Sequence, residues 1–185
     1  MAEIKICGVN DAAFAVAAER LGADYLGLIF AKGSPRQITP EEAKAIVAAL
    51  KGRARVVGVF TDTPVAEIRT IAEQVGFGIV QLHRRAEAAD IQALRQAGFE
   101  VWALAGGAVA DTLIFDASHG DGETALRFGG WKTMLAGGIG PDTVADALRS
   151  GADIVDASGA LEVAPGVKSI PKLETFMRRV AEARP

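Results

Sequence analysis

Two side chains of this sequence are suited to moving protons on a small substrate: Asp116 and the single cysteine, Cys7. Each ends a short apolar run of the kind that forms a buried strand. A strand places alternate side chains on opposite faces, so Lys5 shares a face with Cys7, and Ile4 and Ile6 take the other. A thiol and a carboxyl group on opposite walls of one pocket could act as general base and general acid.

Each of these residues also has an ordinary structural interpretation. A lone cysteine is often a small buried hydrophobic residue, and an aspartate at a strand end often caps the following loop. By the same alternation Lys5 would be buried and needs a carboxylate partner, for which Asp116, Asp156 and Glu3 are candidates. His83 shares a face with the glutamine two residues before it, and we favour a structural role for this histidine.

Two glycine-containing loops and one arginine could hold an anionic substrate. Gly137 and Gly138 follow one apolar run, and Ser158 and Gly159 follow another. Glycine lets backbone N–H groups approach a phosphate closely, and a short helix beginning near Ser158 would add its dipole. Paired glycines are common in turns, so it is their joint position after two strands that favours phosphate binding. Arg36 could hold a carboxylate or phosphate in its planar fork, with a solvated loop charge as the alternative.

Strands and helices alternate along most of the chain. Apolar runs bounded by turn residues predict strands at 3–7, 24–30, 55–60, 78–83, 99–105, 112–116, 133–136 and 153–156. Helical patterns predict helices at 12–21, 40–50, 64–74, 86–97, 141–149 and 171–183. The clearest helix start is Thr39, which precedes Pro40 and forms a capping box with Glu42. This alternation predicts parallel strands joined by right-handed crossovers.

The alternation is interrupted after the fifth predicted strand. Residues 106–111 are too few for a crossover helix, and the next linker has a weak helical pattern at Glu123 to Phe128. We therefore predict a (β/α)₈ TIM barrel, one domain over 1–185, in which the helices after strands 5 and 6 are missing or eroded. An open doubly wound sheet is the alternative. In a barrel, the carboxyl ends of all strands meet at one mouth, which would bring the candidate residues together.

Composition excludes several classes of function. The 185 residues are half hydrophobic and carry a net charge of −3, which provides no basic surface for nucleic acid or membrane. A single cysteine excludes an internal disulfide, and the sequence has no cysteine–histidine cluster for zinc. There is no signal-peptide pattern and no apolar stretch long enough to span a bilayer. We therefore expect a cytoplasmic protein with a small-molecule substrate.

The sequence resembles the phosphoribosylanthranilate isomerase family in short motifs that follow the family's order along nearly the whole chain. They are Lys5–Gly8, Gly22–Phe30, Ser34–Arg36, Val57–Phe60, Val80–His83, Leu135–Gly138, Asp156–Gly159 and Pro165–Lys168. The resemblance implies a cofactor-free Amadori rearrangement in tryptophan biosynthesis. In that reaction N-(5-phosphoribosyl)anthranilate becomes 1-(2-carboxyphenylamino)-1-deoxyribulose 5-phosphate.

The resemblance also implies roles for the candidate residues. Asp116, as general acid, would protonate the ribose ring oxygen and open the ring to a Schiff base. Cys7, as thiolate base, would then remove the C2′ proton, and a cationic mouth would favour the thiolate. Arg36 would hold the anthranilate carboxylate. The phosphate would be bound by backbone amides around Gly137, Gly138, Ser158 and Gly159.

Departures from the family pattern leave other interpretations open. The linkers beside the strand that carries Asp116 are shortened or unusual, and Arg84 and Ala157 replace a glycine and a serine of the family. The alternatives are another phosphosugar isomerase or epimerase barrel, or an eroded barrel that binds phosphate without catalysis. Missing helices would also expose the outer faces of strands 5 and 6, with Trp102 or Phe115 on them. That surface predicts cover by a loop or by a second subunit in a homodimer.

Overall fold

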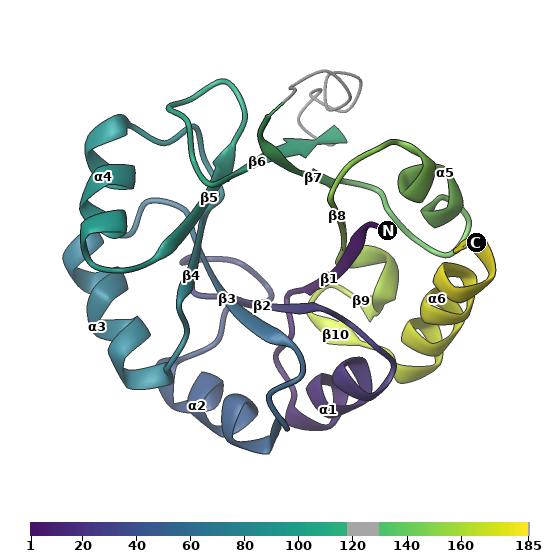
Figure 1. The fold of residues 1–185 in the computed structure, drawn as a ribbon. Coiled ribbons are helices and arrows are strands. Elements are labelled where there is room, and N and C mark those ends of the chain that lie inside the picture. Colours follow the sequence, from purple (N-terminus) through teal and green to yellow (C-terminus); the bar gives the residue numbers. More distant parts are fainter. Residues whose placement is uncertain (118–129, 185) are drawn as a thin grey trace.

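Eight parallel strands close into a barrel in the computed structural model, which describes residues 1–117 and 130–184 (Figure 1). Each strand pairs with the next one along the chain, and the last returns to the first. The strands are β1 Glu3–Cys7, β2 Tyr25–Ile29, β3 Arg55–Phe60, β4 Ile79–Leu82, β5 Glu100–Leu104, β6 Thr112–Asp116, β7 Lys132–Ala136 and β8 Ile154–Ala157. This closure confirms the predicted barrel and excludes the open doubly wound sheet.

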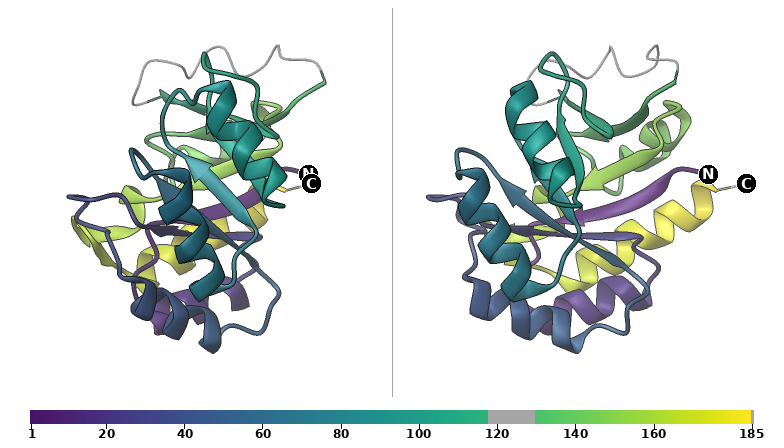
Figure 2. Two further views of the ribbon diagram at one scale, coloured as in Figure 1. Left: turned by 90° about the vertical axis from the view of Figure 1, so that its left-hand side faces the viewer. Right: turned by 60° about the vertical axis from the view of Figure 1, so that its left-hand side comes forward.

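Helices pack on the outside of most of the barrel strands (Figure 2). Within the described residues they are α1 Ala12–Arg20, α2 Pro40–Ala49, α3 Val65–Val75, α4 Ala88–Gln96, α5 Val144–Arg149 and α6 Ile170–Ala183. The predicted start of α5 at residue 141 is wrong by three residues. Thr143 accepts a hydrogen bond from the N–H of Gly140 and donates one to the carbonyl of Gly138, which holds this segment in a turn. None of the described helices is long and apolar enough to cross a membrane.

The connection between β5 and β6 contains no helix, as predicted. The turn is closed by Asp111, whose N–H donates to the carbonyl of Val101 and whose carboxylate accepts from the Val101 N–H at 2.7 Å. Arg95 of α4 also donates to this carboxylate. The crossover is thus replaced by a short turn tied to its own strand and to the preceding helix. The weak helical pattern predicted at 123–128 lies outside the described residues.

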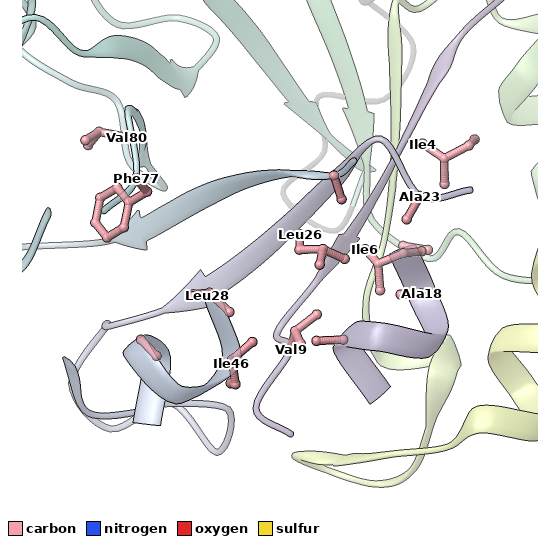
Figure 3. Packing of buried hydrophobic residues seen from close by; sticks show 14 of the residues in the cluster. Ile4, Ile6, Val9, Ala18, Ala23, Leu26, Leu28, Ile46, Phe77 and Val80 are labelled. Carbon is pink, nitrogen blue, oxygen red and sulfur yellow. The ribbon is translucent and has the colours of Figure 1, made fainter. Parts of the chain in front are cut away.

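An apolar layer joins the strands to the surrounding helices. Ile4 and Ile6 of β1 point outward and pack near Ala18 of α1, and Leu28 of β2 lies near Ile46 of α2 (Figure 3). All of these side chains except Ile46, at 3% exposed, are fully buried. The opposite face of each strand is also buried, inside the barrel. Burial on both faces explains why the strands appear in the sequence as nearly continuous apolar runs.

The aromatic residues Trp102 of β5 and Phe115 of β6 are both buried, but on opposite sides of the barrel wall. Trp102 points into the barrel, where its ring packs edge to face against Tyr25 with the centroids 5.0 Å apart. Phe115 does lie on the outer side, but it is only 1% exposed and clusters with Ala105 and Leu113. The predicted outer position is therefore wrong for Trp102, whereas Phe115 does lie on the outer face and is covered within the chain.

A small antiparallel hairpin follows β8 and had not been predicted. It consists of β9 Glu162–Ala164 and β10 Val167–Lys168, after a one-turn 3-10 helix (η3) at Gly159–Leu161. Gly166 has a φ of +79° in the turn, a conformation that glycine adopts without strain. Strands this short show too few alternations for a sequence pattern to reveal them.

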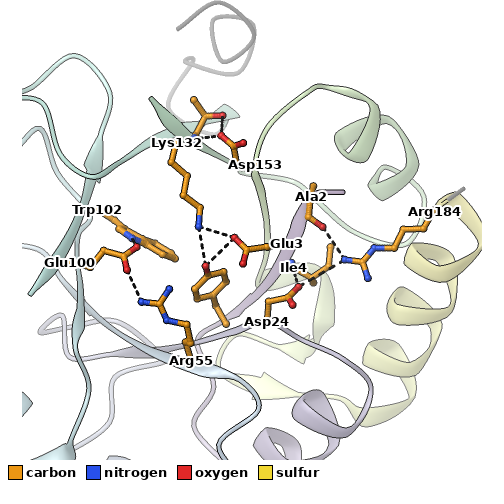
Figure 4. Close-up of polar contacts among 12 residues, drawn as sticks. Ala2, Glu3, Ile4, Asp24, Arg55, Glu100, Trp102, Lys132, Asp153 and Arg184 are labelled. Atoms are coloured by element: carbon orange, nitrogen blue, oxygen red, sulfur yellow. Dashed lines mark hydrogen bonds and ion pairs between the residues drawn. The ribbon is translucent and has the colours of Figure 1, made fainter. Parts of the chain in front are cut away.

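Charged and aromatic side chains close the amino-terminal end of the barrel (Figure 4). The Nζ of Lys132 lies 2.7 Å from the Glu3 carboxylate and 3.0 Å from the hydroxyl of Tyr25. Arg55 donates to the Glu100 carboxylate at 2.6 Å. These contacts join β7 to β1 and β2, and β3 to β5, at the end of the barrel opposite the carboxyl ends of the strands.

Candidate functional site

A cavity of about 540 Å³ opens at the carboxyl ends of the strands. Its wall contains every residue that the sequence predicted to react with or bind a substrate: Cys7, Arg36, Asp116, Gly137, Gly138, Ser158 and Gly159. These residues lie far apart in the sequence, and closure of the barrel brings them to one mouth. The site therefore depends on the whole barrel.

Cys7 ends β1 and is 6% exposed. Space for its side chain comes from Gly27 on β2, because a Cβ at that position would lie 2.8 Å from the Cys7 Sγ. Burial raises the pKa of the Cys7 thiol, and the cations Lys5 and Lys168 only partly offset this effect. The expected cationic mouth is present, but it does not outweigh the burial of the thiol.

Lys5 lies fully buried inside the barrel on the same face as Cys7. Its Nζ contacts the carboxylate of Asp156 at 3.0 Å, because β1 pairs with β8 and these two residues are partners in the register. Of the three predicted partners, Asp156 is therefore the one found. Burial alone would lower the pKa of Lys5, but the Asp156 carboxylate raises it and keeps the lysine charged. A fixed positive charge thus lies close to the thiol.

Asp116 ends β6 on another side of the mouth and is 6% exposed. Its carboxylate lies 3.5 Å from the Nε2 of His83, and the Nδ1 of His83 lies 3.2 Å from the side-chain nitrogen of Gln81. If Gln81 donates to Nδ1, the histidine carries its hydrogen on Nε2, facing Asp116. The predicted common face of Gln81 and His83 is confirmed. His83 also lines the cavity beside Asp116, and its structural role stays a prediction.

Arg36 reaches the mouth from the loop after β2 and forms a bidentate ion pair. Its Nε and Nη2 lie 2.6 Å and 2.8 Å from the two carboxylate oxygens of Glu162. Lys168 approaches the same carboxylate at 2.9 Å. Burial alone would raise the pKa of Glu162, but the hydrogen bonds from Arg36 and Lys168 lower it to about 2. Glu162 and Lys168 were missed because nothing in their spacing around the turn at Gly166 indicates that two charged side chains would be buried.

The loops predicted to bind phosphate have the backbone conformation that their glycines allow. Gly137 and Gly138 have φ values of +87° and +68°, which other residues rarely adopt. Ser158 donates its hydroxyl to the carbonyl of Cys7 at 3.0 Å, which fixes the second loop beside the thiol. The short helix predicted near Ser158 is found, but as the single 3-10 turn η3, which is too short to provide a large dipole.

This arrangement can hold a small substrate with two anionic groups and exchange protons with it. The thiol of β1 and the carboxyl group of β6 face one cavity from strands well separated around the barrel (Figure 1). An arginine fork and glycine-containing loops lie on the same rim. These groups suit acid–base chemistry on a phosphorylated substrate that also carries a carboxylate.

Comparison with known proteins identifies one family. The family model described as N-(5'phosphoribosyl)anthranilate (PRA) isomerase matches residues 4–179. A relative from Granulibacter bethesdensis, named N-(5'-phosphoribosyl)anthranilate isomerase, is 35% identical over an aligned length of 208 residues. The alignment covers 99% of this chain and 100% of the relative. The match extends over nearly the whole barrel, including the strands that carry Cys7 and Asp116.

Solved structures show the same fold. Phosphoribosyl anthranilate isomerase from Thermus thermophilus has a TM-score of 0.87 and 33% identity, covering 98% of this chain and 100% of that one. A second such isomerase, solved in complex with reduced 1-(O-carboxyphenylamino)-1-deoxyribulose 5-phosphate, has a TM-score of 0.82 at 24% identity. It covers 98% of this chain and 100% of its own, so the barrels agree along their whole length.

Proposed function

This chain belongs to the N-(5′-phosphoribosyl)anthranilate isomerase family, aldose–ketose isomerases of tryptophan biosynthesis, and we propose that Cys7 and Asp116 transfer the protons of its reaction. The observation that supports these roles most is that a thiol and a carboxyl group from β1 and β6 line one cavity of about 540 Å³. The same cavity contains groups suited to both anionic ends of the substrate.

The proposed chemistry is an Amadori rearrangement in which no atoms are gained or lost. Asp116 gives a proton to the ribose ring oxygen, the bond from that oxygen to C1′ breaks, and a Schiff base forms with the anthranilate nitrogen. The thiolate of Cys7 then takes the proton from C2′, which leaves an enolamine. Transfer of a proton to C1′ and loss of the hydroxyl proton at C2′ give the aminoketose. Each step uses general acid–base catalysis, and we propose that the enzyme needs no cofactor.

The two anionic ends of the substrate would be held on the rim of the cavity. We propose that Arg36 binds the anthranilate carboxylate, because a guanidinium matches a carboxylate in a planar fork. The phosphate would be held at Gly137, Gly138, Ser158 and Gly159. In this arrangement the ribose lies between Cys7 and Asp116.

The test follows the loss of anthranilate fluorescence from freshly prepared phosphoribosylanthranilate. We expect Cys7→Ala and Asp116→Ala each to lower kcat by roughly a hundredfold or more, as loss of a general base or acid does. Asp62→Ala is the matched control, because it removes an exposed carboxylate just after β3 that does not line the cavity. Its activity should stay within about twofold of wild type. A folded but inert wild type would instead support an eroded barrel that binds phosphate.

We also propose that residues 1–185 form a single catalytic domain and that the enzyme works in the cytoplasm, as the family's place in amino-acid biosynthesis suggests. Tryptophan-free growth of an auxotroph that lacks this isomerase, complemented by the chain alone, tests the first point. Failure to complement, with the protein folded and expressed, would count against it. Cell fractionation tests the second.

We further propose self-association at the β5–β6 side of the barrel. Within the described residues no helix lies between these two strands. Val109 in their connection is 46% exposed, and Trp131, directly before the next strand β7, is 48% exposed. Light scattering at high protein concentration should give a dimer mass, and Trp131→Ser should shift that mass toward the monomer. A strictly monomeric wild type would refute the proposal.

A further inference from the structure

Glu162 is a buried carboxylate that contacts both anion-binding parts of the mouth. It lies on β9, outside the barrel strands, and its side chain is 4% exposed. It accepts hydrogen bonds from the Arg36 fork, from Lys168 at 2.9 Å and from the N–H of Gly166 at 3.3 Å. These donors keep the pKa of this carboxyl group at about 2, so that it is charged at neutral pH. The contacts make Glu162 a connection between segments that bind different ends of a ligand.

On the Arg36 side, Glu162 pairs with one particular edge of the guanidinium. The Nε and Nη2 form one donor edge, and Nη1 with Nη2 forms a second. Glu162 takes the first edge, which turns the second edge away from β9. The arginine stem lies over Gly8, where a Cβ would come within 2.5 Å of the Cδ, and the Nη2 lies 3.5 Å from the Cβ position of Gly159. Arg36 is thus held between the thiol strand and the phosphate loop.

On the other side, Glu162 holds the loop that follows β8. The side chain of Lys168 is 1% exposed, and its Nζ also donates to the carbonyl of Ser158 at 3.1 Å. Ser158 in turn donates to the carbonyl of Cys7. Lys172 of α6 donates to the backbone carbonyl of Glu162 at 2.6 Å, so the backbone that carries this carboxylate is anchored. The predicted phosphate loop is therefore connected through Lys168 to the same carboxylate that holds Arg36.

The hairpin turn is packed against the Arg36 loop. A Cβ on Gly166 would lie 2.2 Å from the carbonyl oxygen of Pro35, so only glycine allows this close approach. Asn10, in the loop after β1, donates to the carbonyl of Gly166 at 2.7 Å. The β9–β10 hairpin is therefore in contact with the loops after β1 and β2 as well as with its own loop after β8.

From this geometry we propose that Glu162 is a positioning residue that fixes the spacing between the carboxylate-binding Arg36 and the phosphate-binding Ser158–Gly159 loop. The mouth is thereby adapted to substrates with a carboxylate at one end and a phosphate at the other. The inference rests on the proposed function, because it uses the roles assigned there to Arg36 and the loop. Glu162 itself would not contact the reacting atoms, so its effect should fall on binding.

The kinetic test compares wild type with Glu162→Gln and with the matched control Glu19→Gln. Glu19 is also a buried carboxylate, 5% exposed, but it accepts N–H groups of Lys51 and Arg53 away from the cavity. We expect Glu162→Gln to raise KM at least tenfold and to change kcat less than threefold. Glu19→Gln should change neither, although both variants lose a buried carboxylate that accepts several hydrogen bonds. In an Arg36→Met background, adding Glu162→Gln should raise KM only slightly further.

Binding of the reduced aminoketose phosphate, measured by calorimetry, separates this inference from the proposed function. We expect Glu162→Gln to bind it at least tenfold more weakly than wild type, whether or not wild type turns over substrate. If wild type binds this compound but is inert, the proposed function is refuted and the positioning role can still be tested. If wild type does not bind it, both the proposed function and the positioning role are overturned. An unchanged KM and Kd in Glu162→Gln, a fall in kcat alone, or an equal effect of Glu19→Gln would overturn the role. If Glu162→Gln does not fold, Glu162→Asp, which keeps the charge on a shorter stem, must show the same rise in KM.

Discussion

At the scale of single residues, the contact between Lys5 and Asp156 affects the thiol most directly. Two charges lie inside the barrel at 3.0 Å from each other, and the lysine is fully buried. Such a pair contributes little net stability, but removal of one partner leaves the other charge buried and unpaired. The pair places a cation near Cys7, where it opposes the effect of burial on the thiol. We therefore infer that the pair acts mainly on the pKa of Cys7 and contributes little to stability.

Lys5→Met should raise the pKa of Cys7 and lower activity at neutral pH. The lysine lowers that pKa, whereas Asp156 and burial raise it. Loss of the lysine therefore raises the pKa of Cys7. The unpaired Asp156 should also cost about 3–5 kcal/mol of unfolding free energy. The rate of alkylation by iodoacetamide as a function of pH gives the thiol pKa, and urea denaturation gives the stability. A thiol pKa equal to that of wild type would show that Lys5 is structural only.

At the scale of elements, the outer face of β3 depends on a glycine for space. Gly58 faces Phe77, which follows α3, and a Cβ at Gly58 would lie 2.5 Å from that ring. The ring belongs to an aromatic cluster in which Phe30 stacks on Phe60 with the centroids 5.2 Å apart and on Phe77 at 5.9 Å. A packed cluster of this kind leaves no room for another methyl group. The glycine thus sets how closely α3 can approach the barrel.

Gly58→Ala should destabilise the protein by about 1–3 kcal/mol, because the aromatic cluster must move. Gly78→Ala is the control: it lies at the start of β4, where a new Cβ meets no atom within 4 Å. That change should be neutral or stabilise slightly, by less than about 1 kcal/mol, through the unfolded chain. Urea denaturation of both variants measures the difference. Equal unfolding free energies for the two variants would mean that the aromatic cluster can shift without loss of stability.

The sequence predicts these elements well because each carries a local signal. The buried strands are short apolar runs, and the capping box of Thr39 is present in the structure with both of its hydrogen bonds. The start of α5 was misplaced because the turn at Thr143 depends on hydrogen bonds that a helix pattern does not encode. The β9–β10 hairpin was missed because its strands are too short to show alternation.

The candidate site was predictable where position along a strand determines it. Cys7 and Asp116 end strands, and all strand ends of a barrel share one mouth. The contacts of Arg36 with Glu162 and of Lys5 with Asp156 join residues more than 120 positions apart. Such pairs follow from how the loops fold over the mouth and from strand register, which one sequence does not specify. The orientation of Trp102 could have been inferred from parity, since it alternates with the outward-facing Val101.

At the scale of the whole molecule, the two ends of the barrel have different contents. The amino-terminal end holds the charged cluster around Lys132 and Glu3 (Figure 4). The carboxyl-terminal end holds the cavity. The charges of the first end are partly exposed, with 33% of the Lys132 side chain and 42% of the Glu3 side chain accessible. A charged cluster and the candidate site thus lie at opposite ends of the barrel.

Lys132→Met tests this separation. Exposed ion pairs are typically worth less than about 1 kcal/mol, so the unfolding free energy should fall by no more than that. Activity should stay within about twofold of wild type, because the side chain points away from the mouth. Fluorescence kinetics and urea denaturation on the same preparation measure both quantities. A tenfold loss of activity would show that the two ends are coupled.

The pairing of β8 with β1 also governs when the site can exist as the protein is made. Cys7 and Ser158 are 151 residues apart, so the hydroxyl that holds the loop beside the thiol leaves the ribosome long after the thiol itself. At usual rates of translation the interval is roughly 8 to 30 s. During that time β1 lacks one of its two neighbouring strands, and Cys7 has no completed pocket around it. The Cys7 thiol is therefore more accessible to oxidants while the chain is being made than after the barrel closes.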